Sequence, residues 1–162
     1  RMEEPGADGA DDVEFLISTN PGESLKPLGR IASGGELSRV MLAIKTVLAD
    51  QDAIETVIFD EIDTGISGRT AQKVSEKLAL IGRSRQVICI THLAQLASMA
   101  DSHYCIEKRA VDGSTQTGIR LLDEQESVEE LARILGGAQI TDAVIDNARE
   151  MKKLAQKFKA HR

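Results

Sequence analysis

Two adjacent carboxylates follow an apolar segment near the middle of the chain. Residues Thr56 to Phe59 read as a strand, and Asp60 and Glu61 come directly after it. A carboxylate at the end of a strand can hold a hydrated Mg²⁺ beside phosphate oxygens, while its neighbour, which points the other way, orients or deprotonates an attacking water. An acidic pair is also a common way to begin a loop, so this pair alone leaves both interpretations open.

A glycine pair opens the apolar-periodic segment upstream, in the sequence Ser33-Gly34-Gly35-Glu36. A serine followed three residues later by glutamate is typical of a helix capping box, which needs no ligand. Each glycine in a first helical turn costs up to ~1 kcal/mol relative to alanine, so the pair indicates that something approaches the backbone closely. A phosphate is the natural candidate, because bare N–H groups, the helix dipole and the Ser33 hydroxyl would face it. Both interpretations stay open at this point.

Thr91 and His92 follow a second apolar strand, which runs from Gln86 to Ile90. A single histidine in this position is more often a helix cap or a satisfied polar group than a catalyst. If this strand lies beside the one before Asp60, however, both carboxyl ends meet at one crevice, and His92 can reach a terminal phosphate. The three polar clusters together favour nucleotide hydrolysis, although no stretch of the chain has the phosphate-loop pattern G-x-x-x-x-G-K-[ST].

The spacing of apolar residues predicts an α/β fold in which a mainly parallel sheet is flanked by helices. The predicted strands cover 13–18, 54–59 and 86–90, and the predicted helices cover 37–48, 69–81, 92–99, 128–135 and 142–159. The run at 54–59 is almost continuously apolar, which indicates a central strand buried on both faces. Strands at 103–108 and 118–122 flank Asp112-Gly113 and predict a small β-hairpin.

Composition narrows the classes of function. The 162 residues, 41% of them hydrophobic, suffice for one domain, and we predict a flexible acidic lead-in at 1–12 and one folded lobe over 13–159. An aromatic content of 2% with no Trp disfavours the stacking of bases. A net charge of −6 argues against a tight grip on a phosphate backbone by this lobe alone.

Cysteine usage and hydropathy indicate the compartment. Cys89 and Cys105 lie in apolar, strand-like contexts, which fits free thiols in a reducing cytoplasm rather than a disulfide framework. No apolar run approaches the ~20 residues that cross a bilayer, and the N-terminus lacks the order of a secretory signal. We therefore expect a cytoplasmic protein with no membrane partner.

Three segments carry a resemblance to a known family. S-G-G-E-L-S-R, I-F-D-E-I-D-T-G-I-S-G and I-T-H-L resemble the signature, Walker B with D-loop, and switch-histidine motifs of ABC-type ATPase heads. More narrowly, the chain is similar to the C-terminal head lobe of the RecN family, SMC-like ATPases of bacterial DNA double-strand break repair and recombination. The similarity spans Gly6 to Leu154 and includes S-T-N-P-G-E and L-A-R-I-L-G-G.

The resemblance implies roles for the signature segment. Ser33, Gly34 and Gly35 would contact the γ-phosphate of an ATP molecule held by the opposite head, and Glu36 stands where transporters usually have glutamine. Ala32 departs from the leucine that commonly opens this motif, a change that affects packing more than chemistry.

The resemblance also implies roles at the ends of the two strands. Asp60 would support Mg²⁺ through water, and Glu61 would activate the attacking water. Asp63 would act across the dimer, and His92 would sense the γ-phosphate. Glu61 and His92 are thus the predicted catalytic residues.

The same resemblance implies partners that this chain lacks. The phosphate loop of the family lies in an N-terminal head lobe, separated from the C-terminal lobe by a coiled coil. The complete protein would sandwich ATP between two heads, bind double- or single-stranded DNA and lie in the cytoplasm on the nucleoid. We expect this chain alone to be inactive, and to expose apolar surface where the other lobe docks.

Three other classes were weighed against an ATPase. A non-catalytic lobe for dimerisation or DNA clamping would keep the fold without turnover. A Toprim-type nuclease needs a carboxylate spacing that D-E-I-D does not supply. A zinc module would use Cys89, His92, His103 and Cys105, but alternate side chains of a strand point to opposite faces, which disfavours this site.

Overall fold

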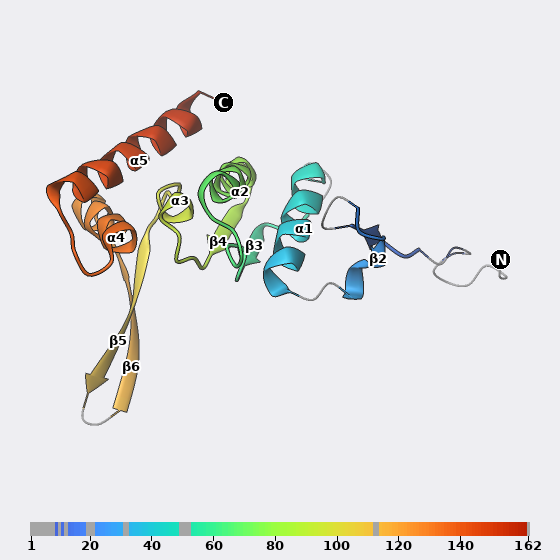
Figure 1. Ribbon diagram of the computed structural model, residues 1–162, viewed down its shortest axis with the longest axis horizontal. Coiled ribbons are helices and arrows are strands. Elements are labelled where there is room, and N and C mark those ends of the chain that lie inside the picture. The colour runs from blue at the N-terminus through green and yellow to red at the C-terminus, as the bar shows by residue number, and fades with distance from the viewer. Residues whose placement is uncertain are drawn as a thin grey trace.

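The computed structural model describes residues 9, 11, 13–18, 22–30, 33–48, 53–111 and 114–161. Apart from Gly9 and Asp11, the predicted lead-in lies outside these residues, as do Ala32 and the Asp112-Gly113 turn. The elements in chain order are β1 (Leu16–Ile17), β2 (Lys26–Pro27), a 3₁₀ turn (Leu28–Arg30), α1 (Gly34–Val47), β3 (Thr56–Phe59), α2 (Gly68–Ile81), β4 (Gln86–Cys89), α3 (Ala94–Ala97), β5 (Tyr104–Val111), β6 (Ser114–Leu121), α4 (Glu124–Gly136) and α5 (Asp142–Ala160). Figure 1 shows them following one another along the molecule, with the hairpin projecting from the rest.

The strands form three separate pairs. β3 and β4 are parallel, whereas β1–β2 and β5–β6 are antiparallel. The prediction of a mainly parallel sheet is therefore not confirmed in the described part of the chain, where one strand pair in three is parallel. After β4 the next strand along the chain pairs with its own hairpin partner, so the described residues add no third strand to the parallel pair.

The parallel pair is buried on one face only. Phe59 is 3% exposed and packs with Val57 in the core, whereas Ile58 between them is 65% exposed. Ile88 and Ile90 are exposed as well. The prediction that 54–59 is buried on both faces is wrong for this chain, because side chains alternate across a strand and α1 and α2 supply apolar partners on one face alone.

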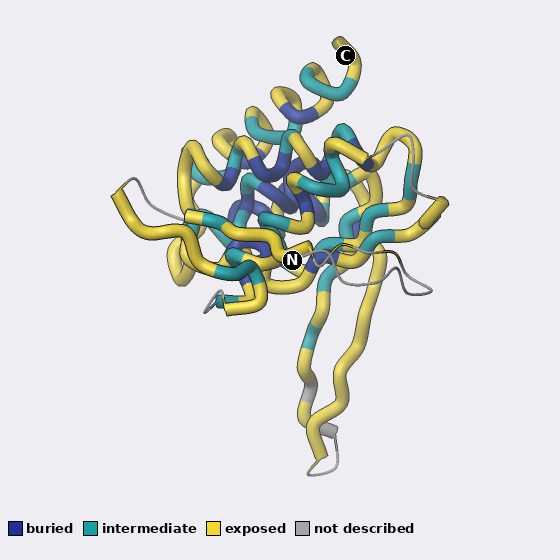
Figure 2. The backbone as a smooth tube through the Cα atoms, turned by 90° about the vertical axis from the view of Figure 1, so that its right-hand side faces the viewer, coloured by how far each residue is buried: buried dark blue, intermediate teal, exposed yellow. Residues whose placement is uncertain are grey.

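Two apolar cores meet at the short helix α3. The first core joins α1, β3, α2 and Leu96 of α3, through Leu42, Phe59, Ile62, Ala71, Val74, Leu78, Ile81 and Leu96. The second core places Ala94 and Ala97 of α3 against Leu131 of α4 and Ala148 of α5. Figure 2 shows the buried residues concentrated in the helical part and the hairpin almost wholly exposed.

α4 begins four residues earlier than predicted because its start is fully capped. Asp123 Oδ1 accepts a hydrogen bond of 2.8 Å from the Glu126 backbone N–H, and Glu126 Oε2 accepts one of 2.9 Å from Asp123 N–H. This reciprocal pair satisfies two amides that a helix start otherwise leaves open. Gly137, with φ of 60°, ends the helix.

The hairpin carries an apolar face that the described residues leave exposed. Tyr104 pairs with Leu121, and Ile106 pairs with Ile119, so the four side chains share one face near the hairpin base. All four are exposed.

No helix in the described part of the chain has the length and apolar character needed to cross a bilayer.

A buried serine joins the hairpin base to both C-terminal helices. Ser127 of α4 is 1% exposed, and its Oγ lies 2.8 Å from His103 Nδ1 and accepts a 2.8 Å hydrogen bond from Lys152 Nζ of α5. Burial, reinforced by the charge of Lys152, lowers the pKa of His103, while Glu130 opposes this change. Burial also lowers the pKa of Lys152. The packing therefore favours a neutral imidazole that accepts the serine proton.

We predict that His103, half-buried beside Ser127 and Lys152, makes the chain less stable in mild acid. The unfolded chain binds a proton on His103 more tightly than the folded chain, since the folded pKa lies below the ordinary value of 6.5. The contribution to the free energy of unfolding is thus complete above pH 6.5 and is lost as the pH falls through the folded pKa. Urea unfolding at pH values from about 7 to about 5 should show a smaller loss for His103→Gln than for the unmodified chain. His161→Gln, at an exposed position, is the control, and equal slopes in all three proteins would contradict the assignment.

Candidate functional site

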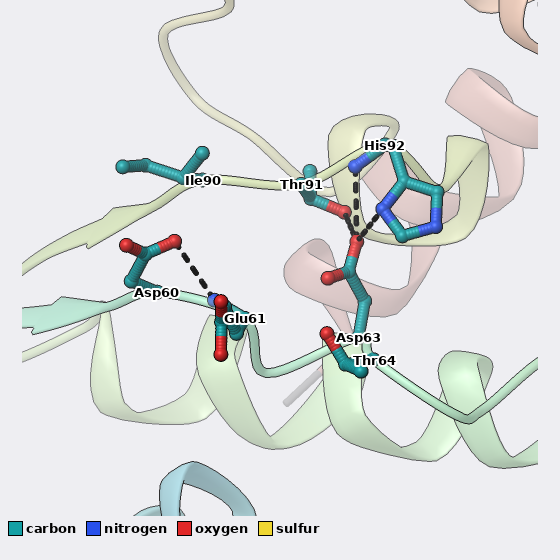
Figure 3. A pocket seen from close by; sticks show the side chains of 7 residues that line it. All are labelled: Asp60, Glu61, Asp63, Thr64, Ile90, Thr91 and His92. Atoms are coloured by element: carbon teal, nitrogen blue, oxygen red, sulfur yellow. Dashed lines mark hydrogen bonds and ion pairs between the residues drawn. The ribbon is translucent and has the colours of Figure 1, made fainter. Parts of the chain in front are cut away.

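A pocket lies where β3 and β4 end side by side. Residues from the two strand ends and the turn after β3 line it, namely Asp60, Glu61, Asp63, Thr64, Ile90, Thr91 and His92 (Figure 3). Its volume of about 220 Å³ is below the roughly 300–1,000 Å³ of pockets that enclose a whole small molecule. The structure thus brings together three sequence-predicted groups, Asp60-Glu61, Asp63 and His92, around a space that suits one part of a larger ligand.

Asp60 and Glu61 present their carboxylates on opposite sides of the chain (Figure 3). Asp60 Oδ1 accepts a 2.9 Å hydrogen bond from the Glu61 backbone N–H. Glu61 has a φ of +55°, and among the described residues it is the only non-glycine residue with a positive φ. A left-handed conformation costs an L-residue roughly 1–2 kcal/mol, so the surrounding contacts must hold Glu61 in place.

Asp63 fastens the turn after β3 to the end of β4. It is 3% exposed, and its Oδ2 accepts hydrogen bonds from Thr91 Oγ1 at 2.5 Å and from His92 N–H at 2.9 Å. His92 Nδ1 lies 3.1 Å from the same oxygen. The carboxylate is therefore engaged within this chain. Its predicted action across a dimer stays a prediction.

The ring of His92 is exposed to solvent, while its backbone and one ring nitrogen are held by Asp63. The side chain is 74% exposed, and Nδ1 faces Asp63, which leaves Nε2 as the ring atom turned outward. When Nδ1 donates to Asp63, Nε2 accepts in the neutral ring and donates once the ring carries both protons. The side chain can therefore meet a charged ligand at the pocket mouth.

The glycine pair meets a protein group rather than open space. A Cβ on Gly34 would lie 2.6 Å from Glu61 Oε2, and a Cβ on Gly35 would lie 2.8 Å from the Glu61 carbonyl oxygen and 3.0 Å from Thr64 Cβ. The close approach predicted from these glycines is real, but the turn after β3 makes it. The Glu61 carboxylate thus points at the positive end of the α1 dipole, where a phosphate was expected.

Ser33 caps α1, which is one half of the predicted capping box. Its Oγ accepts a 3.2 Å hydrogen bond from the Glu36 backbone N–H, and α1 begins at Gly34. The segment from Ser33 to Glu36 does not line the pocket but lies beside Glu61. Of the strand-end residues, Glu61 is therefore the one that contacts the predicted signature segment.

Sequence reasoning assigned no role to two further residues of α1. Ser38 Oγ donates a 2.9 Å hydrogen bond to the Asp60 carbonyl. Arg39 Nη1 donates to the carbonyls of Ile62, at 3.1 Å, and Thr64, at 2.8 Å. The sequence could have indicated them, because Ser38 and Arg39 follow Gly34 and Gly35 by one helical turn. They therefore lie on the side of α1 that faces whatever approaches the glycines.

The carboxylates fit Mg²⁺ better than zinc. Within the described ranges, no three His, Cys, Asp or Glu residues converge on one point. Asp60, one of two exposed carboxylates that line the pocket, suits Mg²⁺, which keeps several waters and binds one or two carboxylates together with phosphate oxygens. The zinc alternative is wrong for this structure, because Cys89, His92, His103 and Cys105 form no such cluster.

The thiol of Cys89 is unreactive near neutral pH. It is a free thiol at the end of β4, and burial, with the nearby charges of Asp63 and Asp60, raises its pKa to about 12. A thiol with so high a pKa is neither a ready metal ligand nor a nucleophile near neutral pH. The chemistry of the pocket therefore belongs to its carboxylates and His92.

Comparison with known proteins supplies relatives. A DNA repair protein RecN of Halalkalibacterium halodurans is 49% identical over 153 residues, which are 94% of this chain and 27% of that protein. RecN of Bacillus subtilis is 50% identical over 93% of this chain and 26% of its own length, and RecN of Deinococcus radiodurans is 48% identical over 93% and 26%. No protein-family model matches the chain.

The three relatives named above are all DNA repair proteins RecN. The chain spans about a quarter of the length of the RecN proteins it matches and is homologous to their C-terminal part. A solved structure described as "Structural biochemistry of ATP-driven dimerization and DNA stimulated activation of SMC ATPases" aligns with a TM-score of 0.48 and 22% identity, over 74% of this chain and 79% of that one.

The two glycines should respond differently to an added methyl group. Gly35→Ala meets the backbone of Glu61 and should lower the free energy of unfolding by about 2 kcal/mol, as overpacking of a fixed site does. Gly34→Ala meets the far end of a flexible side chain and should change stability by less than about 1 kcal/mol, because Glu61 can swing away. Chemical denaturation of both variants is the measurement, and equal losses would mean that the turn does not press on Gly35.

Proposed function

We propose that the chain is the C-terminal lobe of an SMC-like ATPase head that acts in bacterial DNA double-strand break repair and recombination. The observation that carries this proposal is the meeting of Asp60, Glu61 and His92 at the adjoining ends of two parallel strands, with a glycine-fronted helix packed against Glu61. The homology to RecN supports it, since those proteins are named for DNA repair.

In this proposal the strand-end residues act on the terminal phosphate of ATP. Asp60 holds Mg²⁺ through water, and the bound ion would neutralise charge on the phosphate oxygens. Glu61 orients the attacking water and takes its proton. His92, steadied by Asp63 through Nδ1, contacts the γ-phosphate with Nε2.

The signature residues act on a nucleotide of another head. Ser33 to Glu36 form the cap and first turn of α1, where N–H groups and the helix dipole favour a negative charge. Within this chain the Glu61 carboxylate supplies that charge, and in the dimer a phosphate would supply it. Asp63 contributes to the same interface through the turn that it stabilises. ATP bound between two heads would hold them together, and hydrolysis would release them.

Apolar surfaces that the described residues leave exposed support a docking site for a second lobe. Ile58, Ile88 and Ile90 expose one face of the parallel strands, and Tyr104 and Ile106 expose one face of the hairpin. Uncovered apolar area of this kind marks a docking surface. The N-terminal head lobe, which would carry the phosphate loop, is the proposed occupant. The complete protein would bind double- or single-stranded DNA and work in the cytoplasm on the nucleoid.

The first test replaces the proposed base. In the complete protein, Glu61→Gln should lower steady-state ATP hydrolysis by about 100-fold or more, because the amide cannot accept the proton of water. Glu55→Gln, at an exposed position just before β3, is the matched control and should keep full activity. If Glu61→Gln hydrolyses ATP as fast as the unmodified protein does, a non-catalytic lobe for dimerisation and DNA clamping becomes the better explanation.

The second test uses the chain by itself. Without the phosphate loop it lacks the lysine and amide cradle that supply most nucleotide affinity, so we expect no ATP binding in the micromolar range and negligible hydrolysis. Titration calorimetry with ATP and Mg²⁺ measures this directly. Micromolar affinity would show that the pocket and the α1 terminus bind nucleotide unaided, contrary to the proposed division between two lobes.

A further inference from the structure

The turn that carries Glu61 is held from outside by one side chain of α1. Arg39 is half-buried, and its Nη1 donates to the carbonyls of Ile62, at 3.1 Å, and Thr64, at 2.8 Å. The partners are backbone oxygens on both sides of Asp63. The turn itself is closed by a 3.0 Å hydrogen bond from Thr64 N–H to the Glu61 carbonyl.

Two neighbours of Arg39 complete the attachment. Ser38 Oγ donates 2.9 Å to the carbonyl of Asp60, so α1 binds the segment before Glu61 as well as after it. Gly35 makes room for the guanidinium, since a Cβ there would lie 3.0 Å from Arg39 Nη1. One face of α1 therefore grips the chain from Asp60 to Thr64 through three carbonyl oxygens.

Glu61 needs such a grip because its backbone conformation is unfavourable. Its φ of +55° is one that a free glutamate rarely adopts. Contacts with Asp60 on one side and with Ile62 and Thr64 on the other leave the chain little freedom to relax at Glu61. That backbone sets the position and direction in which the Glu61 side chain leaves the turn.

We propose that Arg39 is a positioning residue, which fixes the turn after β3 so that the Glu61 side chain starts from a fixed place for water activation. This inference rests on the proposed ATPase function for its catalytic consequence, but its structural content stands on the hydrogen bonds alone. Arg39 touches neither nucleotide nor water in this role; it acts through the backbone of Ile62 and Thr64.

Arginine suits this task better than other residues. Its charged N–H groups make stronger hydrogen bonds to carbonyl oxygens than neutral donors do, and the planar group holds a fixed direction. Lysine supplies the charge and donors on a flexible stem, so Arg39→Lys should keep part of the function. Arg39→Met keeps the aliphatic stem and loses every donor.

The experiment measures amide hydrogen exchange and ATP hydrolysis in the complete protein. For Arg39→Met we expect amides of residues 61–66 to exchange about tenfold faster or more, as loss of a charge-assisted hydrogen bond predicts. Amides of α2 and β4 should exchange as before. We also expect kcat to fall by about tenfold or more with KM within about threefold, and Arg39→Lys to recover part of the loss. Lys73→Met, the same kind of change at an exposed position of α2, is the control.

The outcomes separate this inference from the proposed function. Unchanged exchange at 61–66 in Arg39→Met overturns the positioning role, whatever the hydrolysis rate. Faster exchange with an unchanged kcat overturns the link to Glu61. If the unmodified protein and Glu61→Gln hydrolyse ATP equally, the proposed function fails, while the exchange data still decide whether Arg39 holds the turn.

Discussion

The geometry of the site depends on the hydrogen bonds that the buried carboxylate of Asp63 accepts from the end of β4. A buried carboxylate is costly unless hydrogen bonds replace its water, and the end of β4 supplies them through Thr91 and His92. The backbone pairing of β3 with β4 finishes at the hydrogen bond from Ile90 N–H to the Phe59 carbonyl. Beyond that point Asp63 connects the segment after β3 to the segment after β4 by hydrogen bonds. This attachment, together with the pairing of β3 with β4 and the contacts from α1, sets the relative positions of Asp60, Glu61 and His92.

The elements near the site were predictable because their signals are local. The helices at 69–81 and 142–159 differ from α2 and α5 by one residue at one end, since apolar spacing and caps define them. The sheet was less predictable. An apolar run indicates a buried strand, but β3 shows that Ile58 can be apolar and uncovered within this chain. Periodicity does not say which chain or segment provides the covering surface.

The candidate site was predictable in its membership and less so in its contacts. Parallel strand ends explain why Asp60 and His92 meet, and the structure shows that meeting. Two glycines indicated a close approach without naming the approaching group. Contacts made by Ser38 and Arg39 join residues 22 to 25 positions apart, and no local pattern encodes such pairs.

The short helix α3 has a consequence for how the molecule unfolds. It has four residues, of which Leu96 belongs to the first core and Ala94 and Ala97 to the second. A single helical turn is not stable without tertiary packing, and here both cores supply it. The two cores therefore share one cooperative unit at this turn, and partial melting of either exposes part of the other. His92 lies two residues before α3, so the pocket and the C-terminal helices are connected through this one turn.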